Sequence, residues 1–380
     1  MTTNKIMKIL ITGGAGFIGK WLIEKMPSDA EVVIVDNLDE QVHRRSKDFA
    51  PELIARAKCI KADVQNIEEY REAIEGTDVV IHLAAQTGTG QSMYEISRYV
   101  QHNANGTAKL LELISSLEHK PRRIVLSSSR AVYGDGAYTD GKSILYSQGR
   151  RVEDLQQGIW EVCGTDGQPL KSLAMHESHL TKPTSVYGFT KLWQEQLLQV
   201  YCESQGIDLV TLRFQNVYGP KQELGNPYTG IIGIFTNAIV QGNRLELFED
   251  GMVTRDFVFV GDVAEAVIEC ATYEKPLNAI LNVGSGQAVT LVDVVETIAE
   301  VIGKKAEYTI SGRFRVGDVR HAIADMENYK TTLGHWTPTS LKEGISQYLK
   351  WYLGQEPLEQ ATLEASLREM EQKGLLLTKK

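Results

Sequence analysis

A glycine-rich turn directly after the first apolar segment constrains the fold of this 380-residue chain more than any other feature. Residues 8–12 read Lys-Ile-Leu-Ile-Thr, and the chain continues Gly13-Gly-Ala-Gly16-Phe-Ile-Gly19. An apolar run with this spacing predicts a strand, a tight turn and the start of a helix. Gly13 allows the turn, Gly16 lets backbone approach a pyrophosphate, and Gly19 lets the helix pack closely on the sheet. The feature predicts a dinucleotide-binding domain at the start of the chain.

A second apolar run, residues 32–35, ends in Asp36. This carboxylate follows the glycine turn by about 20 residues, where a residue that binds the cofactor ribose is expected. A carboxylate repels a 2′-phosphate, so Asp36 favours NAD over NADP. The alternative is a purely structural turn with a solvated Asp36. His43, Arg44 and Arg45 lie nearby in the sequence and are interpreted as a solvated basic loop.

A third strand-like segment ends at Ala62-Asp63-Val64. Asp63 is placed where it can contact the edge of the adenine. A cap or a turn is the alternative role for this aspartate.

Strand-like runs alternate with helix-like segments up to about residue 215. The runs are 8–12, 32–35, 58–62, 79–83, 123–127 and 209–214. Nearly continuous apolar strands separated by helices predict an α/β fold, a Rossmann-type doubly wound parallel sheet covered on both faces. We expect a smaller C-terminal α/β domain for the substrate.

The expected domain boundaries follow from this rhythm. The NAD-binding domain is assigned to 1–212, and residues 252–275 are expected to return to it. The substrate domain is assigned to 213–251 and 276–380. Residues 136–182 break the rhythm and are predicted to be an inserted loop region, a candidate lid. Near the end of the chain, Leu363, Leu367 and Met370 form one helical stripe, expected to pack on the body; a partner helix is the alternative.

Composition excludes several classes of function. The net charge of −9, without a long basic run, argues against nucleic acid as a partner. The longest apolar stretches are strand-sized, so no membrane span is expected, and the first strand follows the N-terminus too closely for a signal peptide. The four cysteines are scattered, which predicts no metal site and reduced thiols in the cytoplasm: Cys59, Cys163, Cys202 and Cys270.

The candidate catalytic group is Ser129 with Tyr187 and Lys191. The tyrosine and lysine are four residues apart and share one face of a predicted helix. Ser129 follows the strand-like run 123–127, whose carboxyl end should open onto the cofactor cleft. Such a trio can remove a proton from a hydroxyl while a nicotinamide accepts a hydride. Lys191 and the positive nicotinamide are expected to lower the pKa of Tyr187.

A second Tyr-x-x-x-Lys match, Tyr138 to Lys142, includes Gly141 and begins the insertion. A stable helix is not expected there, so Tyr138 is not assigned a catalytic role. For Tyr187, the structural alternative is a buried tyrosine with its lysine on a solvated face, and for Ser129 it is a strand-end cap.

Several motifs together resemble the extended short-chain dehydrogenase/reductases that act on nucleotide sugars, over nearly the whole chain. The motifs are Thr12–Gly19, His82-Leu-Ala-Ala85, Asn103 with Gly106-Thr107, Ser127-Ser-Ser129, Tyr187 with Lys191, Arg213–Pro220, Arg255–Asp262, Asn282–Gly286 and Arg315-Val-Gly-Asp318. The resemblance implies NAD as cofactor, a nucleotide-sugar substrate and a homodimer paired through the helix of Tyr187 and the one that follows residue 98. In that pairing, Leu192, Gln196, Gln199 and Val200 would lie near the seam.

The resemblance also assigns binding roles residue by residue. The implied cofactor-binding residues are Gly13, Gly16, Phe17, Ile18, Asp36, Asn37, Asp63, Val64, Leu83, Ala84, Ala85, Asn103, Ser127, Tyr187, Lys191 and Phe214. The implied substrate-binding residues are Gln91, Ser92, Ser129, Asn216, Arg255, Arg315 and Asp318. The arginine assignments agree with the affinity of guanidinium groups for phosphate oxygens, and surface salt bridges are the alternative.

The residues after Ser129 favour one reaction type within that family. Family dehydratases carry an Asp-Glu pair there and family decarboxylases a Glu, whereas this chain has Arg130-Ala131. The Cys/His pair of the family's reductases that also epimerise is absent from this motif. The resemblance therefore implies an epimerase, which oxidises and re-reduces one carbon. A net NAD-dependent sugar dehydrogenase or reductase and an NAD-sensing regulator are the alternatives.

Two further segments, 88–96 and 225–235, resemble the dTDP-L-rhamnose 4-epimerases. That resemblance implies conversion of dTDP-L-rhamnose to dTDP-6-deoxy-L-talose at C4. The insertion departs from that group, because it keeps only Cys163 where cysteine pairs are expected. A UDP-hexose 4-epimerase and a CDP-sugar 2-epimerase remain as alternatives.

Overall fold

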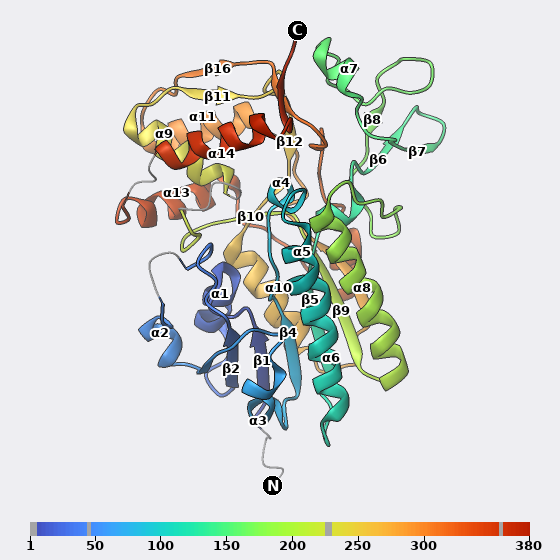
Figure 1. Cartoon of the computed structure of the whole chain (residues 1–380), viewed down its shortest axis with the longest axis vertical. Coiled ribbons are helices and arrows are strands. Elements are labelled where there is room, and N and C mark those ends of the chain that lie inside the picture. The colour runs from blue at the N-terminus through green and yellow to red at the C-terminus, as the bar shows by residue number, and fades with distance from the viewer. Residues whose placement is uncertain (1–5, 44–46, 225–229, 357–359) are drawn as a thin grey trace.

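The protein is built around one seven-stranded sheet (Figure 1). The structure, a computed structural model, describes residues 6–43, 47–224, 230–356 and 360–380, without the side chains of 360–363. The strand order is β14-β9-β5-β4-β1-β2-β3, and every neighbouring pair is parallel. The strands are β1 (Lys8–Thr12), β2 (Glu31–Asp36), β3 (Lys58–Lys61), β4 (Val79–His82), β5 (Arg123–Ser129), β9 (Asp208–Phe214) and β14 (Ala279–Val283). The predicted doubly wound sheet is confirmed.

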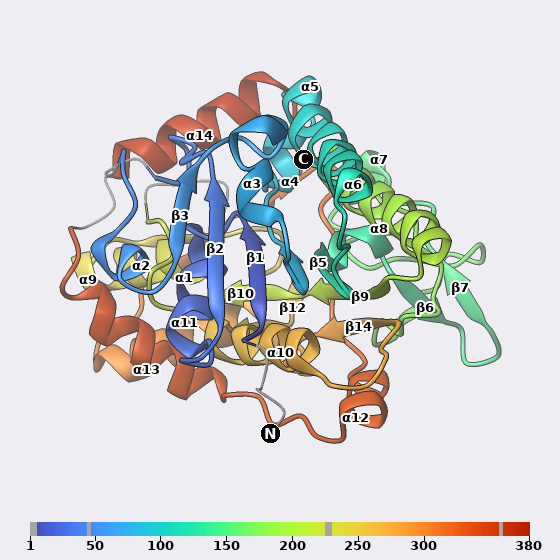
Figure 2. The ribbon, with the colours of Figure 1, turned by 90° about the horizontal axis from the view of Figure 1, so that it is seen from below.

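Both faces of the sheet are covered by helices (Figure 2). In β1, Ile9 and Ile11 face one apolar cluster and Leu10 faces the other, as the alternation of a strand requires. The main covering helices are α1 (Phe17–Lys25) and α10 (Val260–Thr272) on one face, and α6 (Gly106–Ser116) and α8 (Val186–Gln205) on the other. The chain order reverses between β1 and β4, and ligands bind at such a switch point.

The seventh strand corrects the expected domain boundary. Residues 276–380 are assigned to the substrate domain from the sequence, but β14 pairs with β9 in the central sheet. The short apolar run at 279–283 lies far along the chain from the other strands, so the alternation of strands and helices does not reveal it. Helix α10, within 252–275, packs against α1 in the larger lobe.

The inserted region is structured, which corrects its interpretation as a loop. It contains β6 (Ala137–Thr139), β7 (Ile144–Tyr146) and β8 (Lys171–Ser172), which form a small antiparallel sheet in the order β7-β6-β8. Helix α7 (Val152–Gln156) lies between β7 and β8. Tyr138 is fully buried in β6 and not on a helix, so it has no helical partnership with Lys142.

The smaller lobe contains short strand pairs and a helical layer around a third apolar cluster. Its helices are α9 (Ile231–Gln241), α11 (Leu291–Ile302), α13 (Leu341–Tyr352) and α14 (Gln360–Gln372). The strand pairs are β10 (Asn216–Tyr218) with β13 (Phe257–Phe259), β11 (Leu245–Leu247) with β16 (Tyr308–Ile310), β12 (Thr254–Arg255) with β15 (Val289–Thr290), and β17 (Arg313–Arg315) with β18 (Leu376–Thr378).

The remaining helical segments are short. They are α2 (Pro51–Ile54), α3 (Arg71–Ile74), α4 (Thr89–Ser92), α5 (Ile96–Tyr99), a π-helix over Val100–Asn105, α12 (Glu327–Leu333), and 3₁₀ turns over Ile67–Glu69 and Arg130–Tyr133. Helix α14 packs on the body, since Met370 is buried and Leu367 half-buried, whereas the side chain of Leu363 lies outside the described residues. Among the described helices, none combines the length and apolarity needed to cross a bilayer.

A buried ion pair fixes helix α8 to the sheet. Glu195 on α8 accepts hydrogen bonds from Arg213 Nη2 at 2.7 Å and Nε at 3.0 Å, and from the Ser128 hydroxyl at the end of β5. Arg213 lies on β9, and its guanidinium stacks 4.8 Å from the ring centre of Tyr133. Ser185 caps the start of α8 by accepting the N–H of Gly188. The start of the helix is therefore held in register with the carboxyl ends of β5 and β9.

We expect Glu195→Gln to lower the free energy of unfolding by about 3–5 kcal/mol, because it leaves the buried Arg213 without its counter-charge. Urea titration followed by circular dichroism measures the change. Glu203→Gln is the matched control, since Glu203 is an exposed residue of the same helix, and it should cost less than about 0.5 kcal/mol. Equal unfolding midpoints for the two variants would contradict this role of the ion pair.

Candidate active site

A large cleft of about 1030 Å³ lies between the two lobes, at the carboxyl ends of the sheet strands. It is lined by residues of the glycine turn, of β2, β5 and α8, by the segment that follows β4, and by residues within 243–255 and at 315–318 of the smaller lobe. Open α/β sheets bind ligands at this edge. The cleft therefore joins the predicted cofactor and substrate residues in one space.

The glycine turn has the geometry of a dinucleotide site. Gly13 has φ +71°, and a Cβ added there would lie 2.7 Å from the backbone nitrogen of Ala84, so only glycine fits. Helix α1 begins after Gly16, and among the described residues no side chain caps its start. Its first N–H groups are thus left for an anion, as a pyrophosphate requires. The turn fits NAD.

Asp36 is built into the turn and is not solvated. Its carboxylate accepts the N–H of Ala15 at 3.0 Å and the N–H of Leu38 at 2.9 Å, and it is only 8% exposed. His43 lies 3.6 Å away with its side chain also 8% exposed, so the expectation of a solvated basic loop is wrong for His43. Arg44 and Arg45 lie outside the described residues.

Asp63 lines the cleft beside Val64 and also makes a turn. It accepts the N–H of Gln65 at 2.9 Å and the side-chain amide of Asn37 at 2.9 Å. The turn role considered as an alternative is therefore present, and Asp63 in addition orients Asn37, the residue after Asp36.

Most of the residues implied by the resemblance line this cleft. They are Gly13, Gly16, Phe17, Ile18, Asp36, Asn37, Asp63, Val64, Leu83, Ala84, Ala85, Ser127, Ser129, Tyr187, Lys191, Phe214, Asn216, Arg255, Arg315 and Asp318. The segment 225–235, used for the substrate, falls partly outside the described residues, since 225–229 are not described.

Three implied residues do not line the cleft, and their direct ligand roles are corrected. The Gln91 amide is buried and bonded to Gln41, Glu95 and Tyr99. Ser92 is fully buried, and its hydroxyl accepts the backbone N–H of Tyr187 at 3.0 Å. The Asn103 amide bonds both backbone groups of Gln86 and the Thr190 hydroxyl. These side chains support the site from behind, because their polar atoms are turned into the protein.

Ser129, Tyr187 and Lys191, the candidate catalytic residues, line the same cleft. Ser129 ends β5, and Tyr187 and Lys191 lie on the first turns of α8. A hydrogen bond joins the Ser129 and Tyr187 hydroxyl groups, and Lys191 Nζ donates to Gln194 Oε1 at 2.8 Å. One serine and one tyrosine hydroxyl are therefore held together on the cofactor side of the cleft.

Burial favours the neutral forms of both ionisable partners. It raises the pKa of Tyr187, against the lowering effects of the Ser129 hydrogen bond and of the Arg130 charge. It lowers the pKa of Lys191 to about 7, and Glu195 opposes that change. Lys191 can therefore gain or lose its proton near neutral pH, in response to charge placed beside it.

A buried uncharged network stands behind Lys191. Gln194 donates to the Thr107 hydroxyl at 2.7 Å, and His82 lies between Thr107 at 2.9 Å and Thr12 at 2.7 Å. Burial, helped by the charge of Lys191, lowers the pKa of His82 to about 3, so this imidazole is neutral. The network orients Lys191 without adding a competing charge.

The substrate side of the cleft is dominated by arginines around one carboxylate. Arg255 Nη2 donates to Asp318 Oδ1 at 2.8 Å. Although burial opposes it, the charges of Arg255, Arg315, Arg150 and Arg130 hold the pKa of Asp318 below its usual value. Of these arginines, Arg130, Arg255 and Arg315 line the cleft, so positive charge exceeds negative charge there, and the three suit a group with several phosphate oxygens.

Arg130 is a residue of the site to which the sequence analysis assigned no binding role. Its Nε donates to Asn216 Oδ1 at 3.1 Å, and its electrostatic neighbours include both Tyr187 and Asp318. Burial and Arg255 lower its pKa to about 10, so it remains charged at neutral pH. It lies between the candidate catalytic group and the arginine cluster around Asp318. Its position directly after Ser129 was the signal that could have identified it.

The described residues contain no group of three or more His, Cys, Asp or Glu side chains arranged to hold a metal ion.

Comparisons with known proteins agree with this geometry. The family model described as the NAD dependent epimerase/dehydratase family matches residues 9–152 and 160–284. The dTDP-L-rhamnose 4-epimerase of Burkholderia thailandensis is 39% identical to this chain, over 90% of the chain and 94% of that protein.

Two solved structures are similar over nearly their whole length. The UDP-N-acetylglucosamine 4-epimerase from Methanobrevibacter ruminantium, in complex with UDP-N-acetylmuramic acid, has a TM-score of 0.74 and 27% identity, covering 93% of this chain and all of that one. The UDP-glucose 4-epimerase of Thermus thermophilus, in complex with NAD, has a TM-score of 0.71 and 27% identity, covering 92% and 100%. With the glycine turn, Asp36 and the Ser129–Tyr187–Lys191 group in one cleft, the chain belongs to the NAD dependent epimerase/dehydratase family.

Proposed function

We propose that this protein is an NAD-dependent nucleotide-sugar 4-epimerase that interconverts dTDP-L-rhamnose and dTDP-6-deoxy-L-talose. One observation carries the proposal: the arginine cluster around Asp318 shares a cleft with Ser129, Tyr187 and Lys191, and Arg130 lies between them. A diphosphate held by the arginines would bring the attached sugar to the catalytic hydroxyl groups.

In the proposed reaction, Tyr187 takes the proton from the sugar hydroxyl and later returns it. Ser129 donates a hydrogen bond to the same region and favours the ionised tyrosine. Lys191, held by Gln194 on the same face of α8 as Tyr187, would add positive charge there when a bound ligand favours its protonated form. The glycine turn and Asp36 would hold NAD, which would supply the acceptor and donor of the hydride that leaves the sugar carbon and returns to its opposite face.

The choice of an epimerase over an eliminating enzyme rests on the two residues after Ser129. Elimination of water needs an acid and a base beside the sugar carbons. Here that position holds Arg130, bonded to Asn216, and then Ala131. A permanent cation at this position cannot remove a carbon-bound proton, so oxidation and re-reduction of one carbon remains.

The choice of substrate is supported by the 39% identity to a dTDP-L-rhamnose 4-epimerase. Relatives and solved neighbours that act on UDP sugars are 24–29% identical to the chain. A UDP-hexose 4-epimerase is therefore the second candidate.

We also place the enzyme in the cytoplasm, since its four cysteines are free thiols.

Proton NMR of purified protein with dTDP-L-rhamnose tests the proposal, because epimers have equal mass. We expect talose signals to appear without added NAD, since the cofactor is regenerated in each cycle. UDP-glucose and UDP-N-acetylglucosamine are the parallel substrates. Conversion of a UDP sugar alone would reject the dTDP substrate, and steady formation of NADH would reject the epimerase.

Tyr187→Phe and Lys191→Ala should each lower kcat at least a hundredfold, the scale of general acid–base catalysis. The rate of epimer formation measures the loss. Tyr138→Phe is the matched control, since Tyr138 is the other tyrosine with a lysine four residues on, but is buried in β6. Wild-type turnover in Tyr187→Phe would show that another group moves the proton.

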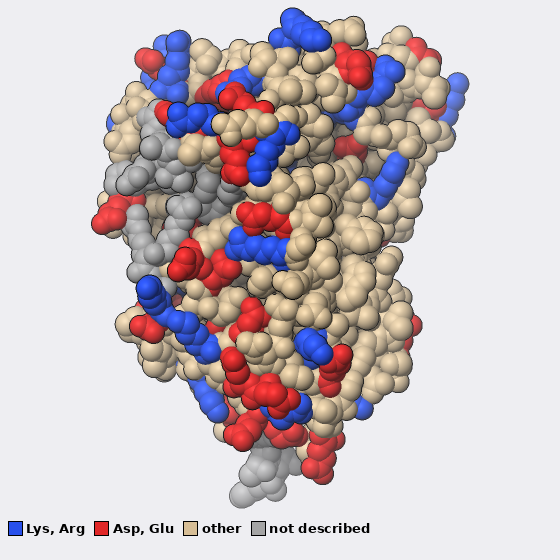
Figure 3. Space-filling view, in the orientation of Figure 1, with Lys and Arg blue, Asp and Glu red and all other residues tan. Residues whose placement is uncertain are grey.

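We propose that the enzyme is a homodimer paired through α8 and the segment from α5 to α6. On α8, Phe189 and Val200 are 61% and 69% exposed and lie three turns apart on one face. Ile96 and Val100 are exposed on the neighbouring segment. The face over α5 and α8 carries few charges (Figure 3). Gln196 and Gln199 are exposed on this face. Leu192 packs inward, so it is not part of the proposed interface.

Sedimentation equilibrium should give twice the mass of one chain for the wild type. Val200→Glu should give the mass of a single chain, because the interface would then bury two unpaired carboxylates. Leu353→Glu is the control, since Leu353 is 65% exposed in the smaller lobe. A wild type that sediments as a monomer would refute this pairing.

A further inference from the structure

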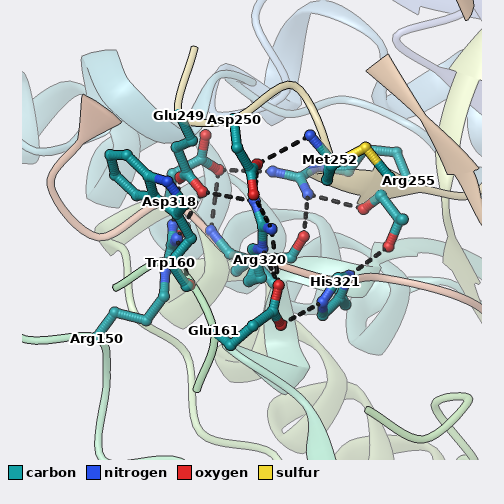
Figure 4. Close-up of polar contacts among 12 residues, drawn as sticks. Arg150, Trp160, Glu161, Glu249, Asp250, Met252, Arg255, Asp318, Arg320 and His321 are labelled. Carbon is teal, nitrogen blue, oxygen red and sulfur yellow. Dashed lines mark hydrogen bonds and ion pairs between the residues drawn. The ribbon is translucent and has the colours of Figure 1, made fainter. Parts of the chain in front are cut away.

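The inserted region is joined to the smaller lobe by Arg150. Arg150 Nη1 and Nη2 donate to the two carboxylate oxygens of Glu249, each at 2.8 Å, and Nη2 also donates to the backbone oxygen of Asp318 at 2.7 Å (Figure 4). The side chains of Arg150 and Glu249 are 4% and 3% exposed. Arg150 and Glu249 thus form a buried, bidentate ion pair between the insertion and the smaller lobe, which are about a hundred residues apart in the sequence.

A second contact from the insertion runs through Glu161. Arg320 Nε donates to Glu161 Oε1 at 2.8 Å, and His321 Nε2 lies 2.9 Å from Glu161 Oε2. Arg320 also donates to Asp250 at 2.7 and 2.8 Å and to Glu249 at 3.0 Å. Figure 4 shows Arg320 between Glu161 and Asp250. Glu161 thus joins the insertion to Arg320 and His321, in addition to the contact made by Arg150.

The network holds the two segments that carry the substrate arginine and its carboxylate. Arg255 Nη1 donates to the backbone oxygen of Thr254 at 2.8 Å, and the Thr254 N–H donates to the backbone oxygen of Arg320 at 3.1 Å. Asp318, the partner of Arg255, receives Arg150 on its own backbone oxygen. Arg255 is thus connected to the network through its neighbour Thr254, which bonds to Arg320. Asp318 is connected directly, through the hydrogen bond from Arg150.

The cost of this arrangement points to a function beyond general stability. Buried ion pairs gain little over apolar packing, because desolvation offsets their attraction. Glu249 in addition adopts φ +55°, a left-handed conformation that a residue with a side chain rarely takes. Strain and buried charge are concentrated at the border of the cleft, since Glu249 also lines it.

We propose that the insertion is a positioning clamp: through Arg150 and Glu161 it fixes the segments 249–255 and 318–321, so that Arg255 and Asp318 are held ready for a nucleoside diphosphate. This inference rests on the proposed nucleotide-sugar function. It assigns to the insertion a role in affinity for the nucleotide and none in the transfer of protons or hydride.

Arg150→Met tests the clamp, because it removes the charge and the donors and keeps a similar length. Titration calorimetry with dTDP and with UDP should show Kd for the preferred nucleotide raised at least tenfold. At saturating substrate, kcat should stay within about threefold, because Ser129, Tyr187 and Lys191 are not touched. Arg151→Met is the matched control: Arg151 is the next residue, is 75% exposed and pairs only locally with Asp154.

Hydrogen exchange separates the clamp from the proposed function. Backbone amides of 249–255 should exchange faster in Arg150→Met than in Arg151→Met, whether or not a nucleotide is present. Wild-type Kd and wild-type exchange in Arg150→Met would overturn the clamp. A wild-type protein that binds neither nucleotide would overturn the proposed function instead.

If Arg150→Met does not fold, Glu161→Gln provides the second test, since Glu161 is a third exposed and its loss is milder. It should raise Kd for the nucleotide and leave kcat nearly unchanged. Asp154→Asn, in the same inserted region, is its control and should leave both values unchanged. Equal Kd values for Glu161→Gln and Asp154→Asn would also overturn the clamp.

Discussion

The ion pair between Glu195 and Arg213 is the constraint on which the catalytic geometry depends. It joins α8 to β9, and through Ser128 it also joins α8 to β5, one residue before Ser129. Tyr187 and Lys191 are on the same helix, so their distance from Ser129 is fixed by an ion pair whose two residues do not line the cleft. The buried polar side chains around them, from Gln194 to Thr12, complete a rigid base for the site.

The two sides of the cleft use opposite electrostatic conditions. On the side of Tyr187 and Lys191, burial favours the neutral forms of both side chains. A charged form is favoured there when the charge of a bound ligand offsets the cost of burial. On the substrate side, permanent arginine charges outnumber the carboxylate of Asp318. The first condition suits groups that must exchange protons, and the second suits a ligand whose charge never changes. Arg130 stands at the border and influences both.

The sequence predicts those features that depend on short stretches of chain. The glycine turn, Asp36 and the Tyr187–Lys191 spacing were identifiable because strand, turn and helix each leave a local pattern. The direction of a side chain is set by distant contacts, which explains why Gln91, Ser92 and Asn103 were assigned to ligands while they face inward. The network around Arg150 could not be predicted either, because its partners are brought together only by the folded smaller lobe.

The pairing of β17 with β18 has a consequence for the order in which the protein can become active. Arg315 lies on β17, whose hydrogen-bonding partner is residues 376–378, and Leu375 and Met370 line the same cleft. The larger lobe takes its last sheet strand from residues 279–283 and completes its apolar cluster with Met326 and Tyr329, so it can form while later residues are still being synthesised. The nucleotide side of the cleft cannot, because it needs residue 378. During translation, the cofactor side of the cleft is therefore completed at about residue 329 and the side formed by the smaller lobe only at residue 378, a delay set by ribosome speed at roughly 5–20 residues per second.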